Sequence, residues 1–230
     1  MSLDARLRPF FANAVAQTAR RPITHVMVGG NASCKTTYAE NAFARNHIDL
    51  SKMVNANFDA IRNALLGKGV SFRDLSLQQC FELNRLQVSV LDYAFENKAD
   101  VYYETFDYDS LIMDRQDQYP ERELHVRVFL TDRDAAWKRM LARQAGDVKP
   151  SHSRKIFDDT HDKAYQSIGR YASRANRLAI FDTSDGQFSP LIYAYDQEVN
   201  MHNEAGLARH GLQSSVNGNY FVPHYAARIV

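Results

Sequence analysis

Apolar and polar positions follow two different periods along the chain. Five short apolar runs predict strands, at residues 25–29, 52–57, 100–104, 124–130 and 177–182. Segments with apolar positions three and four residues apart predict helices, at residues 4–19, 35–45, 59–66, 74–98, 132–144 and 153–175. Strands that alternate with helices are typical of parallel sheets, so we expect an α/β fold with a five-stranded parallel sheet and helices on both faces.

The two ends of the chain fall outside this alternation. Residues 1–22 are expected to form an N-terminal helical extension. Ser189 followed by Pro190 predicts the start of a last helix, because serine caps helices and proline suits the first turn. The segment 188–230 then ends in an aromatic tail at residues 220–225. Packing on the body, a homo-oligomer contact and a base-stacking surface all remain possible roles for this tail.

Composition narrows the class of protein. The chain has 230 residues, 45% of them hydrophobic and 24% charged, as in ordinary globular domains. No apolar stretch reaches the roughly 18 residues that a membrane span needs, and two cysteines form no disulfide framework. We therefore expect a cytoplasmic protein without membrane contact. The scattered histidines lack metal-ligand spacing, which disfavours a zinc site.

The charge is uneven although its net value is only +1. Residues 133–177 contain eleven lysines and arginines against five acidic residues, a local balance of +6. A basic segment in a neutral protein suits a polyanionic substrate at one site, not a coat of nucleic acid. The alternative is an ordinary solvated helix face.

A small-residue loop follows the first predicted strand and carries the strongest signal in the sequence. It fits the phosphate-binding pattern G-x-x-x-x-G-K-[ST], except that a cysteine replaces the second glycine. Backbone N–H groups of residues 30–36 are expected to wrap the β-phosphate, and the next helix adds its dipole. In this reading Lys35 reaches the phosphates of ATP and the Thr36 hydroxyl binds Mg²⁺. The expected nucleotide-binding residues are Gly29, Gly30, Asn31, Ala32, Ser33, Cys34, Lys35, Thr36 and Thr37. An ordinary strand–turn–helix would leave the lysine at a helix start unexplained.

Candidate catalytic and acceptor residues follow the other strands. Asp59, after the second strand, is a candidate to take or orient the proton of an acceptor hydroxyl, and Arg62 lies one turn later. Glu104 and Thr105 end the third strand, where they could bind the acceptor. For each of these residues a purely structural role is the alternative: a helix cap, a solvated arginine, or polar residues at a strand end.

A pair of arginines at helical spacing precedes a predicted mobile connection. Arg139 and Arg143 fall on one face of the helix at 132–144, for which Thr131 is the expected cap. Residues 146–153 contain glycine, proline and serines and predict a flexible stretch. Two arginines beside it suit a lid that closes on a triphosphate, whereas the alternative is surface arginines over a packed helix.

Together these motifs resemble the P-loop kinases of the polynucleotide kinase and zeta-toxin type. The resemblance implies a kinase core at residues 23–187 with a small helical lid around 139–155. It makes Asp59 the general base, Arg62 the contact to an acceptor phosphate, Glu104 and Thr105 acceptor-binding residues, and Arg139 and Arg143 the lid arginines. The segment around Asp59 is longer than the family pattern, so Asn57 is an alternative occupant of the base position.

The resulting expectation is an ATP- and Mg²⁺-dependent kinase of a hydroxyl on a nucleic-acid or nucleotide-type acceptor. The acceptor is either a 5′-hydroxyl polynucleotide or a hydroxymethylated base in DNA. The alternative is a zeta-toxin-like kinase of a UDP-sugar, with a neutralising partner. An alternative of another class is a nucleotide-binding regulatory protein without turnover, for which Cys34 would be the reason.

Overall fold

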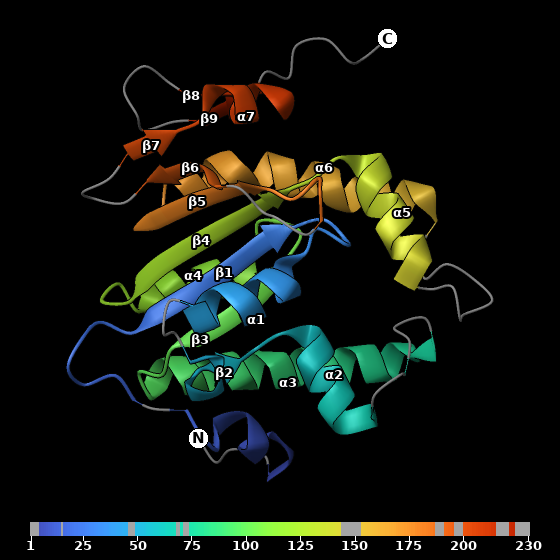
Figure 1. The fold of residues 1–230 in the computed structure, drawn as a ribbon. Coiled ribbons are helices and arrows are strands. Elements are labelled where there is room, and N and C mark those ends of the chain that lie inside the picture. Colours follow the sequence, from blue (N-terminus) through green and yellow to red (C-terminus); the bar gives the residue numbers. More distant parts are fainter. Residues whose placement is uncertain are drawn as a thin grey trace. The chain divides into compact units, whose positions relative to one another are not determined.

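Parallel and antiparallel pairing divide the main sheet into two parts. In this computed structural model, which describes residues 5–14, 16–45, 49–67, 70, 74–143, 153–186, 191–195, 200–214 and 221–223, the strand order is β2-β3-β1-β4-β5-β6-β7 (Figure 1). Its strands are β1 (Ile23–Gly29), β2 (Val54–Asn55), β3 (Val101–Thr105), β4 (Glu123–Leu130), β5 (Arg177–Asp182), β6 (Leu191–Tyr195) and β7 (Asn200–His202). The pairs β2–β3 and β4–β5 are parallel, whereas β5–β6 and β6–β7 are antiparallel. The predicted α/β fold is thus correct, but the sheet has seven strands and an antiparallel edge instead of five parallel strands.

The chain is divided into two compact units. The first unit comprises Met1–Val26, Ala39–Glu104 and Asp109–Glu123, and the second comprises Met27–Tyr38, Thr105–Tyr108 and Leu124–Val230. The helices described for them are η1 (Ala5–Phe11), α1 (Lys35–Arg45), η2 (Leu50–Lys52), α2 (Phe58–Leu66), α3 (Leu77–Glu96), α4 (Ser110–Gln118), α5 (Arg133–Arg143), α6 (Arg154–Ala172) and α7 (Glu204–Arg209). A separate pair of short strands, β8 (Leu212–Ser214) and β9 (Phe221–Pro223), is antiparallel. No helix in the described part of the chain is both long and apolar enough to cross a membrane.

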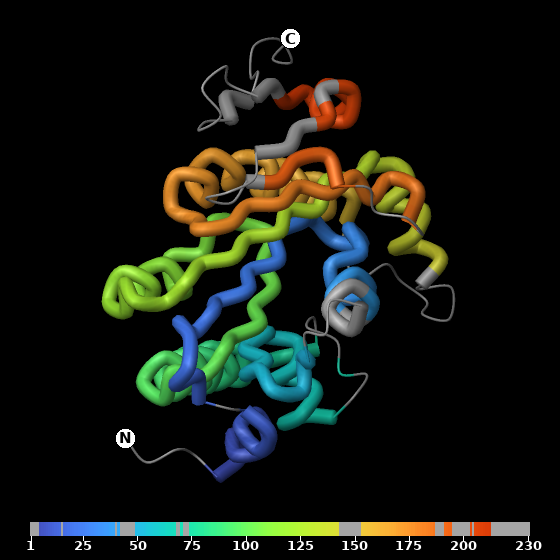
Figure 2. Tube along the Cα trace, turned by 60° about the vertical axis from the view of Figure 1, so that its left-hand side comes forward, coloured from blue at the N-terminus to red at the C-terminus, as the bar shows by residue number. Residues whose placement is uncertain are grey.

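The long helix α3 organises the first unit. A capping box begins it: the Ser76 side chain accepts from the Gln79 N–H, and the Gln79 side chain accepts from the Ser76 N–H. Its apolar residues Leu83, Leu86, Val90, Leu91, Ala94 and Phe95 are buried as the sequence predicts, whereas Leu77 and Phe81 near its start are exposed. Helix α2 packs on α3 (Figure 2). The buried Gln87 side chain of α3 donates from Nε2 to the Ala56 carbonyl at 2.9 Å. This bond satisfies a backbone group just after the two-residue strand β2.

In the second unit, β4 and β5 form the centre of the packing. The two strands pair in register from His125 with Arg177 to Leu130 with Asp182. Phe129 of β4 and Phe181 of β5 stack, with ring centroids 5.4 Å apart. Parallel pairing brings the carboxyl ends of both strands together, where polar residues that leave the strands can meet.

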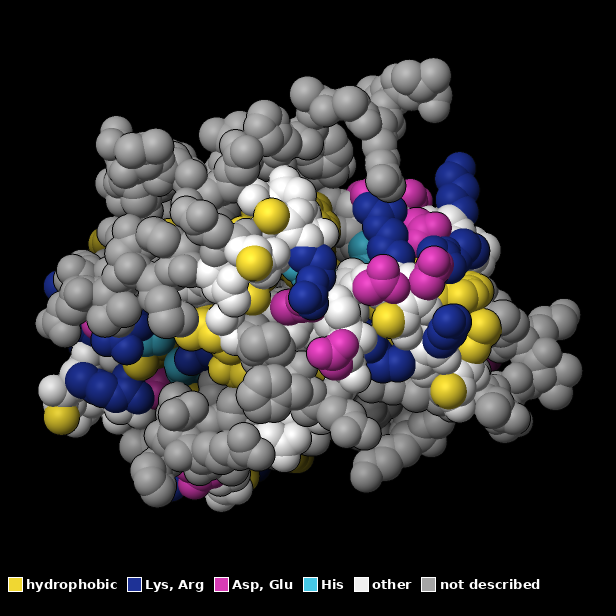
Figure 3. Space-filling view, turned by 45° about the horizontal axis from the view of Figure 1, so that its top comes forward, with side chains coloured by type: hydrophobic (Ala, Val, Ile, Leu, Met, Phe, Trp, Pro, Cys, Tyr) yellow, Lys and Arg dark blue, Asp and Glu magenta, His cyan; other side chains and the backbone are white. Residues whose placement is uncertain are grey.

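Basic residues of α5 and α6 are paired with acidic residues of the same two helices. Arg154 lies 2.8 Å from Asp134 and 3.0 Å from Asp158, and Arg133 is paired with Asp162. Among the side chains coloured in Figure 3, lysines and arginines are interspersed with acidic residues. Two arginines of the predicted basic segment, Arg133 and Arg154, are therefore paired with acidic neighbours.

Several predicted elements differ from the structure. The N-terminal segment forms the 3₁₀ helix η1 and not a helix over residues 4–19. Helix α4 was not predicted, and the second strand is confined to Val54–Asn55. The helix expected from Ser189–Pro190 is wrong, because Leu191–Tyr195 pairs with β5 as strand β6. Ser189 and Pro190, most of the predicted lid connection and most of the aromatic tail lie outside the described residues.

We predict that Gln87→Leu lowers the free energy of unfolding by about 1–3 kcal/mol, because the buried Ala56 carbonyl loses its donor. Urea denaturation measures the change. The matched control is Gln78→Leu on the same helix, where the side chain is exposed and the free energy should barely move. Equal effects of the two substitutions would contradict the role of the hydrogen bond.

Candidate functional site

The loop between β1 and α1 contains two residues in a left-handed backbone conformation. Ala32 has φ 58° and Cys34 has φ 66°. A side chain in this region is unfavourable by about 1–2 kcal/mol, and glycine avoids that cost. The cysteine therefore stands where the backbone favours glycine, which is the physical meaning of its departure from the motif. Its thiol is buried and lies 3.7 Å from the Gly186 carbonyl.

Two glycines at the start of the loop allow close approach of neighbouring groups. A Cβ on Gly29 would lie 2.5 Å from Ser33 Oγ and 3.0 Å from the Phe129 carbonyl. A Cβ on Gly30 would lie 2.4 Å from the ring of His161. A larger residue at Gly29 must displace Ser33 or part of β4, and one at Gly30 must displace the His161 ring of α6.

The start of α1 has the charge distribution of an anion site. Its first turn contains no acidic residue, so the positive end of the helix dipole is uncompensated. Lys35 Nζ donates to the carbonyls of Gly29 and Gly30, at 2.7 and 3.1 Å, which places the ammonium group over the loop. Thr36 is exposed in the same turn, at the position where the loop pattern has a hydroxyl that can bind Mg²⁺.

Two of the loop N–H groups expected to wrap phosphate have other partners. The Asn31 N–H donates to Thr160 Oγ1 at 3.2 Å, and the Ser33 N–H donates to the Gly30 carbonyl at 3.3 Å. These two N–H groups therefore have partners within the protein, and the wrapping of phosphate by the N–H groups of residues 30–36 stays a prediction. The Asn31 peptide is held by α6.

Helix α6 contributes two residues that the motif analysis missed. His161 Nε2 lies 3.0 Å from the Asn31 carbonyl, and Thr160 accepts from the Asn31 N–H. Burial lowers the pKa of His161 to about 4, and the positive charges of Lys35 and Arg133 act in the same direction. The neutral ring must therefore carry its proton on Nε2 to donate to that carbonyl. The only sequence signal was a histidine at the core spacing of α6, four residues after Phe157.

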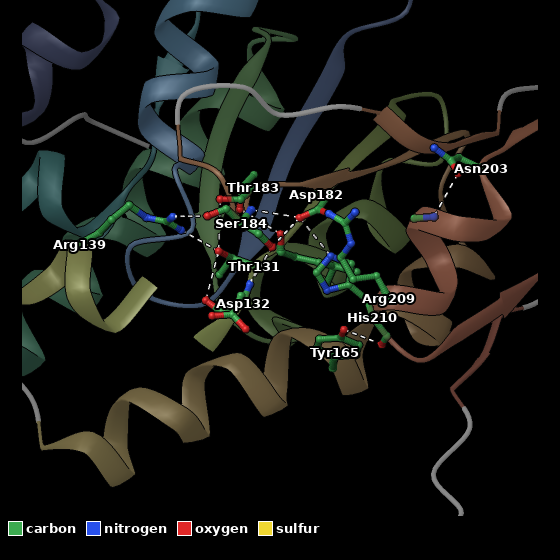
Figure 4. Close-up of polar contacts among 12 residues, drawn as sticks. Thr131, Asp132, Arg139, Tyr165, Asp182, Thr183, Ser184, Asn203, Arg209 and His210 are labelled. Atoms are coloured by element: carbon green, nitrogen blue, oxygen red, sulfur yellow. Dashed lines mark hydrogen bonds and ion pairs between the residues drawn. The ribbon is translucent and has the colours of Figure 1, made fainter. Parts of the chain in front are cut away.

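Arg139 is bound by two backbone carbonyls and a hydroxyl, and Figure 4 shows its contacts with Thr131 and Ser184. Its Nε and Nη2 each lie 3.2 Å from the Ala32 carbonyl of the loop. Nη1 donates to the Ser184 carbonyl at 2.9 Å, and Nη2 donates to Thr131 Oγ1 at 2.6 Å. The structure thus places this predicted catalytic arginine beside the phosphate loop, where it joins the loop to the segment after β5. The side chain of Arg143 lies outside the described residues.

The same contacts correct the predicted cap of α5. Asp132 Oδ1 accepts from the Ala135 N–H at 2.8 Å, as a helix cap does. Thr131 instead binds Arg139 and donates to the Thr183 carbonyl at 3.3 Å.

Asp182, at the end of β5, connects the loop after that strand to α7 (Figure 4). Its carboxylate accepts from the Ser184 hydroxyl at 2.6 Å and lies 2.8 Å from Arg209 and 3.2 Å from His210. Burial raises the pKa of Asp182, but the hydrogen bonds from Ser184 and the adjacent His210 outweigh it and lower the pKa overall. The carboxylate is thus ionised and orients Ser184, the residue that Arg139 contacts.

The predicted base and acceptor residues belong largely to the first unit. Asp59 Oδ1 lies 2.9 Å from Nη1 of Arg62, and the two side chains are 75% and 16% exposed. Asn57 accepts from the Glu104 N–H through its side chain, which ties the start of α2 to the end of β3. That bond occupies Asn57, so Asp59 is the carboxylate available to solvent at this helix start. Thr105, which falls in the second unit, closes a turn on the backbone of Asp107.

We predict that Cys34→Gly yields a protein more stable than Cys34→Ala by about 1 kcal/mol, because only alanine retains a Cβ in the left-handed region. Denaturant unfolding of both variants measures the difference. The control pair is Cys80→Gly and Cys80→Ala inside α3, where the order should reverse because glycine disfavours a helix interior. An alanine variant at position 34 as stable as the glycine variant would contradict the assigned conformation.

The buried His161 predicts a pH dependence of stability. The unfolded histidine takes up a proton as the pH falls through 6.5, whereas the folded one stays neutral down to about pH 4. The neutral His161 therefore makes its full contribution to the free energy of unfolding above pH 6.5. As the pH falls from 6.5 to 4, the free energy of unfolding decreases by up to about 3 kcal/mol. Unfolding of wild type and His161→Gln across this range measures it. A difference between the two proteins that does not change with pH would contradict the prediction.

Comparison with known proteins agrees with this geometry. A family model described as zeta toxin matches residues 11–188. The structure of the Streptococcus pneumoniae PezAT chromosomal toxin–antitoxin system is similar, with a TM-score of 0.62 and 10% identity over 82% of this chain and 77% of that one. The AvrRxo1-ORF1:AvrRxo1-ORF2 structure with sulphate ions has a TM-score of 0.60 and 11% identity over 89% of this chain. Its structure with ATP has a TM-score of 0.58 and 12% identity.

The coverage and identity of these matches define what they establish. This chain spans 66% of the AvrRxo1 structure, slightly less than two thirds, and at these identities the likeness concerns the fold. No curated protein matches the sequence. The family match, over residues 11–188, extends over more than half of the chain. The chain therefore belongs to the zeta toxin family and has a P-loop kinase fold.

Proposed function

We propose that the chain transfers the γ-phosphate of ATP to a hydroxyl group of a small nucleotide-type acceptor, with a nucleotide sugar as the leading candidate. The observation that carries this proposal is the pair formed by Asp59 and Arg62. A largely buried arginine fixes one oxygen of a carboxylate that is itself 75% exposed. A positioned and accessible carboxylate is what a general base for an acceptor hydroxyl requires.

The charge pattern favours a small acceptor over a polynucleotide. Binding along a nucleic-acid backbone needs a continuous basic groove or stripe. Arg133 and Arg154 of the basic segment are instead paired with acidic side chains. A single anionic group on a nucleotide needs only a local cation such as Arg62. The 5′-hydroxyl polynucleotide and hydroxymethylated DNA remain second candidates, supported by the overall excess of basic residues in residues 133–177.

The proposed reaction assigns a role to each candidate residue. The loop at residues 29–37, Lys35 and the positive end of α1 bind the triphosphate of ATP, and Thr36 holds Mg²⁺, which neutralises phosphate charge. Asp59 takes the proton of the acceptor hydroxyl. The acceptor oxygen then forms a bond to the γ-phosphorus as the bond to the β–γ bridging oxygen breaks, and ADP leaves. Arg139 and Arg143 are proposed to stabilise the charge that develops in this step.

The non-catalytic alternative rests on Cys34 alone. Its side chain is buried and its thiol lies beside the Gly186 carbonyl, and Lys35 keeps its position over the loop. These contacts support a working loop in spite of the substitution. Because PezAT is described as a toxin–antitoxin system and AvrRxo1-ORF1 was solved with ORF2, a neutralising protein partner belongs to this proposal.

We predict that the γ-phosphate of labelled ATP is transferred to one member of a panel of acceptors. The panel contains UDP-sugars, free nucleotides, 5′-hydroxyl DNA and RNA, and hydroxymethyl-base DNA. Asp59→Asn should reduce transfer at least about a hundredfold without weakening ATP binding, because general-base catalysis contributes 10²–10⁴ in rate. Lys35→Ala should reduce ATP binding itself.

Each outcome bears on a separate part of the proposal. Label on a UDP-sugar alone supports the leading candidate, and label on 5′-hydroxyl DNA replaces it with the second. Full activity in Asp59→Asn would exclude this residue as the base. The exposed Asp114 on α4 provides a control, because Asp114→Asn should leave transfer unchanged.

A further inference from the structure

The phosphate loop is held from outside at two successive carbonyl groups. His161 of α6 contacts the Asn31 carbonyl at 3.0 Å, and Arg139 of α5 donates to the Ala32 carbonyl at 3.2 Å. Thr160 accepts from the Asn31 N–H, so α6 binds both the N–H and the carbonyl of Asn31. The Thr160 hydroxyl in turn donates to the Phe157 carbonyl at 2.8 Å, which fixes its direction.

These contacts surround the strained part of the loop. Ala32 lies in the left-handed region at φ 58° between the two held carbonyls. A non-glycine residue keeps such a conformation only where the surrounding structure imposes it. The His161 ring also packs directly against Gly30, where no side chain separates the two. The imidazole thus both donates a hydrogen bond to the loop and packs against it.

Apolar contacts also hold this part of the loop. Ala32 packs against a cluster formed by Ala136, Met140 and Phe157, and so does Trp137. The ring of Trp137 meets that of Phe157 edge to face at a centroid distance of 5.1 Å. The loop therefore rests on α5 and α6 through a packed surface as well as through hydrogen bonds.

We propose that Thr160 and His161 are positioning residues that set the phosphate loop in its nucleotide-binding conformation. His161 donates from Nε2 to the Asn31 carbonyl, and Thr160 accepts from the Asn31 N–H. The two residues act through the loop and touch no reacting atom. The consequence for ATP affinity rests on the proposed use of ATP at this loop, whereas the consequence for the loop conformation does not.

Two pairs of substitutions separate the hydrogen bond from the packing. His161→Phe keeps a ring of similar size and removes the donor, whereas His161→Gln can supply an amide N–H in place of Nε2. Thr160→Val and Thr160→Ser form a second pair, in which only serine retains the hydroxyl. Gln166→Ala is the control, because this side chain is exposed on the same helix.

The first readout is the reactivity of Cys34, which needs no nucleotide. The chain has two cysteines, so Cys80→Ser leaves Cys34 as the single thiol. The buried thiol should react slowly with a maleimide in this background. His161→Phe and Thr160→Val should accelerate labelling at least about tenfold at a temperature where circular dichroism shows the variants folded. His161→Gln, Thr160→Ser and Gln166→Ala should label within about threefold of the parent.

The second readout is the dissociation constant for Mg-ATP, followed through the emission of Trp137, the single tryptophan. His161→Phe should weaken binding at least about tenfold, and His161→Gln should restore it to within about threefold. Labelling that changes as expected while no variant binds Mg-ATP would support the positioning role and contradict the proposed function. Unchanged labelling and affinity in His161→Phe, or equal defects in the phenylalanine and glutamine variants, would overturn the inference.

Discussion

The backbone of the phosphate loop requires support from outside itself. Ala32 and Cys34 occupy left-handed conformations that disfavour side chains. The loop keeps this shape because its carbonyls are bound by Arg139 and His161, and because Ala32 packs on the apolar cluster of α5 and α6. A glycine at position 34 would relax one of these constraints. Because position 34 is a cysteine, the surrounding contacts must hold the left-handed conformation that glycine would adopt without steric cost.

The loop is also linked to residues that lie far from it in the sequence. Arg139 joins the loop to Ser184, and Ser184 is oriented by the Asp182 carboxylate. Asp182 is in turn contacted by Arg209 and His210 at the end of α7. The loop that begins at Gly29 is therefore linked through these contacts to a helix that lies outside the family match, which ends at residue 188.

The periodicity of apolar residues correctly predicted elements that form from their own local sequence. The fifth strand was expected at 177–182 and forms Arg177–Asp182, and the long helical pattern at 74–98 contains α3. The segment after Pro190 shows the limit of such signals. Its serine and proline favour a helix start, but Leu191–Tyr195 is rich in residues that suit strands and pairs with the free edge of β5. His161 was missed for a related reason, because its role arises only when α6 meets the loop.

The central claim is that an ATP-dependent kinase works with a phosphate loop held by α5 and α6. A crystal structure with Mg²⁺ and a non-hydrolysable ATP analogue tests it most directly. The claim predicts triphosphate over the loop and Lys35 on its oxygens. It also predicts Ala32 and Cys34 at positive φ, with His161 still on the Asn31 carbonyl. A triphosphate bound elsewhere, or a loop that binds it only after releasing Asn31 from Thr160 and His161, would contradict the claim.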